Sequence, residues 1–102
     1  MILGKRKTCS SMAEVRAEID ALDRAIVALL ADRLHYIDEA ARIKQSRDQV
    51  RDEARIADVI GKVAAEAQRL GADTKVVAAA YRSLIEASIL HELDAFDRRL
   101  SR

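Results

Sequence analysis

Residues 15–44 read VRAEIDALDRAIVALLADRLHYIDEAARIK and contain neither glycine nor proline. Apolar side chains recur in this stretch at intervals of three and four, which is typical of one face of an α-helix. They are Val15, Ile19, Leu22, Ile26, Leu29, Leu30, Ile37, Ala40 and Ala41. The pattern predicts one helix from about Met12 to about Gln45, near 50 Å long at roughly 1.5 Å per residue. This length exceeds the diameter of a compact domain of this size, so we expect the helix to pack on a second chain.

Two basic residues, Arg33 and Lys44, fall on the same apolar face. They are separated by eleven residues at about 100° each, so their side chains share a direction and lie roughly 16 Å apart along the axis. A buried cation is costly unless an anion meets it. The pattern favours an anion-binding cavity inside a helical assembly. Taken singly, Arg33 also suits a structural ion pair, and Lys44 also suits a side chain that extends to solvent near its helix end.

The following residues predict a loop and a second helix. Residues 46–51 are polar except for Val50 and read as a loop. Asp52 is placed to cap the free N–H groups of the second helix, and Gly71 is placed to end it. The apolar positions of this helix are Ile56, Val59, Ile60, Val63, Ala67 and Leu70. With no alternation typical of strands anywhere in the chain, the fold class is all-α, with three helices per protomer.

Asp73 and Thr74 are candidate caps for the third helix. Like the first helix, the third has polar residues at positions of its apolar face. Ser88 and Glu92 lie four residues apart on one face and interrupt its apolar stripe. A serine inside a helix usually bonds the carbonyl four residues back, and a lone glutamate usually forms an ion pair. The stripe consists of Val77, Tyr81, Leu84, Ser88, Glu92, Ala95 and Phe96.

Arg16 and Arg55 are further candidate anion ligands. Arg16 precedes Arg33 by 17 residues, which places it about 25 Å away along the helix. In a two-fold dimer with antiparallel first helices, Arg16 would reach the pocket of the partner chain; alternatively it pairs with Asp20. Arg55 lies in the first turn of the second helix, where a cation is unfavourable unless it faces an anionic ligand or Asp52 offsets it.

The composition bounds the remaining classes of function. The net charge is +1, from 18 basic and 17 acidic residues, and gives no support for binding nucleic acid or a membrane surface. We interpret residues 1–12, with the cluster Lys5–Lys7, as a disordered or non-native leader, and 13–102 as the helical domain. The single cysteine, Cys9, excludes an internal disulfide, and no apolar run is long enough to span a membrane. A cytoplasmic location fits these features.

Motifs for nucleophilic, metal or phosphate-loop chemistry are missing from the sequence. His35 and His91 fall on different predicted helices without an obvious carboxylate partner. We interpret both as surface or interface residues. The candidate site therefore consists of the interrupting charges and Ser88, with no metal ligands among its residues.

In combination, these residues resemble the all-helical chorismate mutase family. Each matching segment is short, but together they follow the family order and spacing over about residues 13 to 96. The segments are 15–23 (VRAEIDALD), 29–33 (LLADR), 43–44 (IK), 50–55 (VRDEAR) and 84–89 (LIEASI). The resemblance implies an intertwined homodimer of three-helix protomers with two equivalent sites.

The resemblance also implies a role for each site residue. Arg33 would hold one substrate carboxylate, and Arg16 of the partner chain would hold the other. Lys44 and Glu92 would donate hydrogen bonds to the ether oxygen, which gains negative charge as its C–O bond breaks. The remaining residues would contact the ring hydroxyl, add positive charge near the substrate and line the site; they are Asp52, Arg55 and Ser88, respectively.

Two positions depart from the family pattern. Ile56 stands where typical mutases carry a glutamate that contacts the ring hydroxyl, and an apolar residue there also occurs in the isochorismate pyruvate-lyase branch. Glu92 stands where many members have glutamine, so it must carry a proton in order to donate. Burial would favour that protonated form.

The activity implied is the rearrangement of chorismate to prephenate, an isomerase reaction that needs no cofactor or metal. Its partners would be a chorismate-like dicarboxylate and a second copy of the chain. The alternatives are isochorismate pyruvate lyase, a mutase of an amino analogue of chorismate, and a non-catalytic helical dimer.

Overall fold

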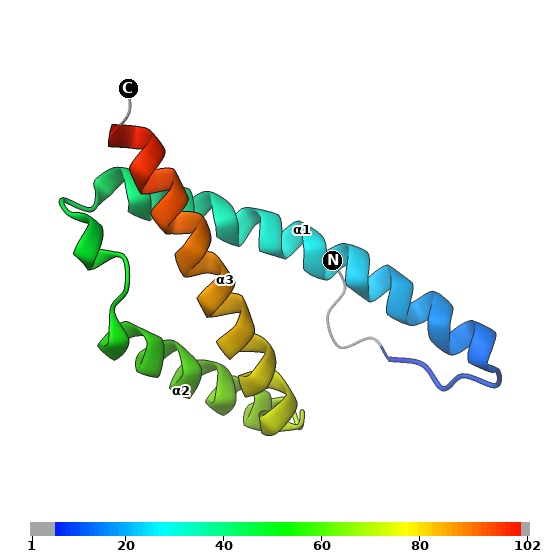
Figure 1. Ribbon diagram of the computed structural model, residues 1–102. Helices are drawn as coiled ribbons and strands as arrows, with labels where there is room; N and C mark the ends of the chain where they lie inside the picture. The colour runs from blue at the N-terminus through cyan, green and yellow to red at the C-terminus, as the bar shows by residue number, and fades with distance from the viewer. Residues whose placement is uncertain (1–5, 101–102) are drawn as a thin grey trace. The chain divides into compact units, whose positions relative to one another are not determined.

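The chain forms an all-α structure, as the sequence predicts. A computed structural model describes residues 6–100, which contain three α-helices, one 3-10 helix and no strand (Figure 1). The elements are α1 (Met12–Ile43), η1 (Arg47–Gln49), α2 (Glu53–Arg69) and α3 (Thr74–Leu100). No helix within this described range is long and apolar enough to cross a membrane. Residues up to His35 form one compact unit, and residues from Tyr36 onward form a second.

The N-terminal unit contains most of α1 and the residues that begin it. The Ser11 hydroxyl accepts from the backbone N–H of Glu14 at 3.2 Å, and the Glu14 carboxylate accepts from the backbone N–H of Ser10 at 3.1 Å. The bond to Ser11 satisfies a donor that the first turn of α1 leaves free, and the bond to Glu14 holds the residue before it. Lys7 forms an ion pair with Glu18 at 3.2 Å. The leader over residues 1–12 stays a prediction, and residues 1–5 lie outside the described range.

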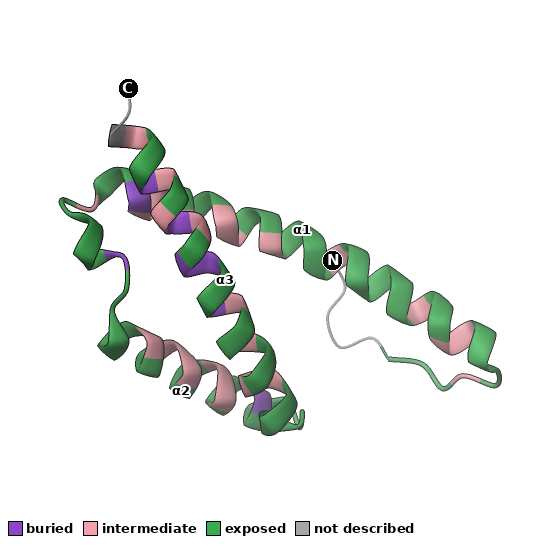
Figure 2. Cartoon of the chain, in the orientation of Figure 1, coloured by how far each residue is buried: buried purple, intermediate pink, exposed green. Residues whose placement is uncertain are grey.

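Much of the apolar face of α1 is exposed in the single chain. The most exposed members of the predicted stripe are each about half accessible: Ile19, Leu22, Ile26 and Leu29. Figure 2 shows buried residues concentrated in α3 and in the segments that pack on it, with few along α1. The homodimer expected from the length of this helix stays a prediction.

The C-terminal unit is built on the contact between α2 and α3. The chain reverses at Gly71, whose φ of 73° is the left-handed conformation that glycine adopts most easily, and α2 ends there as predicted. A core cluster is formed by Val50, which lies just before α2, and by Ile85 and Ile89 of α3. Packed against this core cluster are Ile56, Val59, Ile60 and Leu93.

Two parts of the predicted core are corrected by this arrangement. Val50, the single apolar residue of the predicted loop, is only 4% exposed and anchors that segment, which contains η1. Ile85 and Ile89 are buried although the predicted stripe of the third helix omits them. The error arose because α3 carries apolar residues on several sides, so the spacing alone did not identify the face that packs on α2.

Candidate functional site

The centre of the candidate site is a contact between Lys44 and Glu92. Lys44 directly follows α1, and its Nζ donates to Glu92 Oε2 on α3 at 2.7 Å. Glu92 is only 4% exposed, and the Lys44 side chain is 28% exposed. A partly buried ion pair of this kind is weak evidence for a role in stability, because the cost of desolvation offsets the attraction between the charges. The structure thus joins two residues that the sequence singled out, 48 positions apart.

The backbone of the connecting segment also contacts Lys44. The Lys44 Nζ lies 3.4 Å from the carbonyl oxygen of Val50, which is itself part of the core cluster. The ammonium is therefore held between a carboxylate from α3 and a carbonyl from the segment between α1 and α2. This arrangement orients a point donor, and the side-chain entropy of Lys44 is already reduced before any ligand binds.

Ser88 lies one helical turn before Glu92 on α3 and is buried. Its hydroxyl donates to the carbonyl oxygen of Leu84 at 2.7 Å, which is the local bond predicted for a serine inside a helix. Ser88 and Glu92 are the two buried polar residues among those described, and they share one face of α3. The buried polar groups that α3 brings to the candidate site are therefore the side chains of these two residues.

Asp52 and Arg55 lie at the start of α2, as predicted. Asp52 caps the helix, because its Oδ1 accepts from the backbone N–H of Arg55 at 3.0 Å. The Arg55 guanidinium donates to Asp58 Oδ2 at 2.6 Å. Hydrogen bonds from Lys62 and then Arg55 lower the pKa of Asp58. In this structure Arg55 is therefore directed along α2 towards Asp58.

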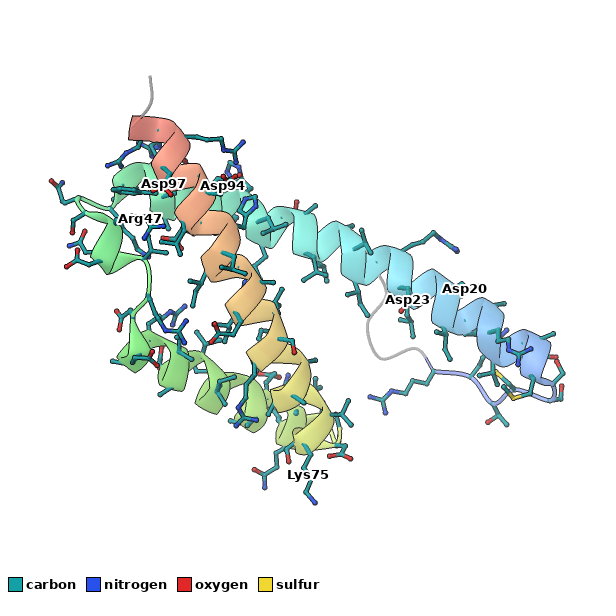
Figure 3. All side chains as sticks on the ribbon, viewed as in Figure 1. Asp20, Asp23, Arg47, Lys75, Asp94 and Asp97 are labelled. Atoms are coloured by element: carbon teal, nitrogen blue, oxygen red, sulfur yellow. The ribbon has the colours of Figure 1, made fainter. Side chains whose placement is uncertain are left out.

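Two arginines that the sequence analysis did not single out fasten the segment between α1 and α2 to α3. Arg47 pairs with Asp97 at 2.9 Å, and the two residues lie together in Figure 3. Arg51 donates to the two carboxylate oxygens of Glu86 through its terminal nitrogens Nη1 and Nη2, at 2.9 and 2.8 Å. These hydrogen bonds lower the pKa of Glu86 and raise that of Arg51. The sequence offered little indication of these contacts, because an arginine in a polar stretch is normally expected to be exposed to solvent without a partner.

Arg16 and Arg33 belong to the N-terminal unit and lie on α1. Arg16 is exposed, and among the described residues no ion pair joins it to Asp20, the partner considered from spacing. Arg33 is half-buried. Both arginines belong to a different unit from Lys44 and Glu92, and each unit is described separately. The roles of Arg16 and Arg33 as carboxylate ligands therefore stay predictions.

His91 corrects one prediction. It does have a carboxylate partner, because its Nε2 lies 2.7 Å from Asp38 Oδ1 on the last turns of α1. The side chain of His91 is 36% exposed and that of Asp38 is 54% exposed. The pair links α1 to α3 next to Glu92, and its distance in sequence made it invisible to pattern analysis.

Comparison with known proteins bears on this geometry. The family model for chorismate mutase type II matches residues 15–93, which include every candidate site residue. Among curated proteins, the isochorismate pyruvate lyase of Pseudomonas aeruginosa is 28% identical over 85 residues. That similarity covers 83% of this chain and 84% of the lyase.

Proposed function

This chain belongs to the chorismate mutase type II family, and we propose that it catalyses the rearrangement of chorismate to prephenate. The observation that carries the proposal is the buried contact between Lys44 and Glu92 at 2.7 Å. In the reaction, the ether C–O bond breaks while a C–C bond forms within the same molecule. Such a step needs no nucleophile; it needs a restrained substrate and donors aimed at the oxygen that gains charge.

Lys44 and Glu92 are the donors in this proposal. The Lys44 ammonium supplies a point donor to the ether oxygen, and Glu92 supplies a second one when it carries a proton. Glu92 is buried, and an electrostatic contact away from water is stronger than one in water. Binding of substrate, together with uptake of one proton from solvent by the Glu92 carboxylate, replaces the direct Lys44–Glu92 hydrogen bond with two hydrogen bonds to the ether oxygen.

The two substrate carboxylates require two further cations. We assign one carboxylate to Arg33 and the other to Arg16 of a second copy of the chain, because the planar guanidinium binds a carboxylate through two parallel hydrogen bonds. Asp52 contacts the ring hydroxyl, Arg55 adds positive charge, and Ser88 lines the site.

A homodimer is part of the same proposal. The half-exposed stripe of α1, from Ile19 to Leu29, needs an apolar partner. A second copy of α1 is a partner of the right length and chemistry, and a symmetric dimer brings the same stripe to both sides of the interface. This arrangement makes the site incomplete in one chain, since Arg16 then acts across the interface.

Isochorismate pyruvate lyase is the second candidate, favoured by the curated relative and by Ile56. That reaction breaks the corresponding ether bond and yields salicylate and pyruvate. Ile56, however, packs against the core cluster, so packing already accounts for an apolar residue at this position. The same Lys44–Glu92 pair would serve the mutase reaction or the lyase reaction. The side chains that contact the substrate ring would decide which of the two reactions occurs.

A paired assay tests the proposal. The purified protein is incubated with chorismate and, separately, with isochorismate, and the products are resolved by chromatography between pH 5 and 8. Prephenate from chorismate is the expected result. Salicylate and pyruvate from isochorismate, with little prephenate, would assign the lyase. Binding of either compound without turnover would identify a non-catalytic member or a mutase of an amino analogue, which a third incubation with that analogue distinguishes.

A further inference from the structure

The C-terminal end of α1 is capped by a side chain from another helix. Arg99, near the end of α3, donates through Nη1 to the carbonyl oxygens of Ala41, Arg42 and Lys44 at 2.9, 2.6 and 2.9 Å, respectively. The last carbonyls of a helix have no partner within it, and they carry the negative end of its dipole. A guanidinium at this position both satisfies the acceptors and meets the dipole with opposite charge.

The Arg99 guanidinium is itself held in place. Its central carbon lies 4.3 Å from the ring centroid of Phe96, one turn earlier on α3. Among the residues that the structure describes, Phe96 is the largest fully buried side chain, at 2% exposed. Stacking on a fixed aromatic ring restricts an arginine whose charge already engages three carbonyls. The cap is therefore a rigid connection between the core of the C-terminal unit and the end of α1.

This connection ends on the backbone of Lys44. Immediately after that residue the chain leaves the helix, because the N–H groups of Gln45 and Ser46 bond to Gln49 Oε1 at 2.7 and 3.2 Å instead of to α1. The Lys44 side chain contacts Glu92 at its other end. Lys44 is thus fixed at its carbonyl oxygen by Arg99 and at its Nζ by Glu92.

We infer that Arg99 is a positioning residue for Lys44, holding its backbone so that the ammonium meets the reacting oxygen. The inference rests on the proposed function, since Lys44 acts on substrate there. Arg98 provides a matched control: it is the neighbouring arginine, but it pairs with Asp94 on its own helix at 3.0 Å. Its removal leaves the cap on α1 intact.

Kinetics of the full-length protein test the inference. Arg99→Met should lower kcat roughly tenfold with KM nearly unchanged, because a displaced donor weakens transition-state contacts more than ground-state binding. Arg98→Met should remain within about twofold of wild type. Arg99→Lys, which keeps a cation able to bond carbonyls, should recover part of the loss and remains informative if Arg99→Met does not fold.

A double-mutant cycle separates positioning from a general structural defect. If Arg99 acts through Lys44, then adding Arg99→Met to Lys44→Ala should lower kcat/KM by less than about twofold further. A full additional tenfold loss would overturn the inference. So would a kcat for Arg99→Met equal to that of wild type.

Amide hydrogen exchange supplies a readout that does not depend on catalysis. The amides of Gln45 and Ser46 should exchange faster in Arg99→Met than in wild type, and at the wild-type rate in Arg98→Met. Unchanged exchange in Arg99→Met would overturn the inference whatever the activity. If the wild-type protein is inactive on every chorismate-like compound while these amides respond as expected, the proposed function fails and the anchoring by Arg99 stands.

Discussion

The N-terminal part of α1 and the middle of α3 bury their apolar residues to very different extents. Ile19, Leu22 and Ile26 on α1 are each about half exposed, whereas Ile85 and Ile89 on α3 are at most 9% exposed. Within one chain, α3 has α2 and Val50 to pack against, while the stripe of α1 remains open. The comparison teaches that one chain brings Lys44 and Glu92 together by itself, whereas the proposed roles of Arg16 and Arg33 on α1 depend on a second copy of the chain.

Truncating an apolar side chain should show the largest difference between the middle of α3 and the N-terminal part of α1, measured as the loss in the free energy of unfolding. Ile85→Ala should lower the free energy of unfolding by about 2–4 kcal/mol, because it leaves a cavity in the core cluster. Ile26→Ala should cost far less in an isolated chain and should instead make Tm depend more steeply on protein concentration. Chemical denaturation for the free energy of unfolding and thermal denaturation for Tm, each at two protein concentrations, check both. Equal, concentration-independent losses would contradict the distinction between a closed core and an open association surface.

Lys44→Ala should lower kcat/KM by on the order of 100-fold or more, by analogy with the loss of one oxyanion donor. Arg33→Ala should do the same through loss of a carboxylate contact. Lys62→Ala is the matched control, because Lys62 is exposed and pairs with Asp58 within α2. Steady-state kinetics with chorismate measure all three. Near-normal activity in Lys44→Ala would remove the basis of the site assignment.

Arg16→Ala tests whether the N-terminal unit serves the site of a partner chain. Alone, the variant should lose roughly 10- to 100-fold in kcat/KM. Mixed with Lys44→Ala under conditions that exchange subunits, it should recover about a quarter of wild-type activity, since half of the dimers then hold one intact site. Mixing that restores nothing, with exchange verified by mass spectrometry, would place Arg16 in its own chain's site or outside any site.

Glu92→Gln should keep most of the wild-type kcat, because a glutamine N–H can donate to the ether oxygen at the position that the proposal gives to Glu92. Steady-state kinetics with chorismate check this. A loss as large as that of Lys44→Ala would show that Glu92 does not act as a donor to that oxygen.

The smallest effect is expected at the ion pair between Arg51 and Glu86. The pKa of Glu86 is lowered in the folded chain by hydrogen bonds from Arg51, so the pair stabilises the fold above the ordinary glutamate pKa of about 4.3 and loses this effect as pH falls further. Glu86→Gln should therefore lower Tm slightly at neutral pH, and the difference should vanish in acid. Glu66→Gln is the matched control, because Glu66 pairs with Arg69 within α2.

The sequence predicted local features well because their causes are local. The extent of α1, the Asp52 cap and the Gly71 turn each follow from residues within a few positions of one another. It also singled out Lys44 and Glu92, because a charge on an apolar face is visible without knowing its partner. Their direct contact, at 2.7 Å, required the structure.

What the sequence did not reveal depends on contacts between distant positions. Val50 is a lone apolar residue in a polar stretch, and only the packing of Ile85 and Ile89 explains its burial. Asp38 and His91 are 53 positions apart, and Arg99 caps carbonyls 55 to 58 positions away. Backbone carbonyls have no signature in the sequence, so no pattern could identify Arg99 as their donor.

The order in which the chain is synthesised gives the Arg99 cap a consequence for biogenesis. A ribosome produces α1 before α3, so the nascent helix has neither Glu92 for Lys44 nor Arg99 for its final carbonyls. The α2–α3 hairpin, closed by a short turn, can form quickly, whereas the end of α1 must wait for contacts of long sequence separation. During that interval the apolar stripe of α1 is the surface that a chaperone would meet first.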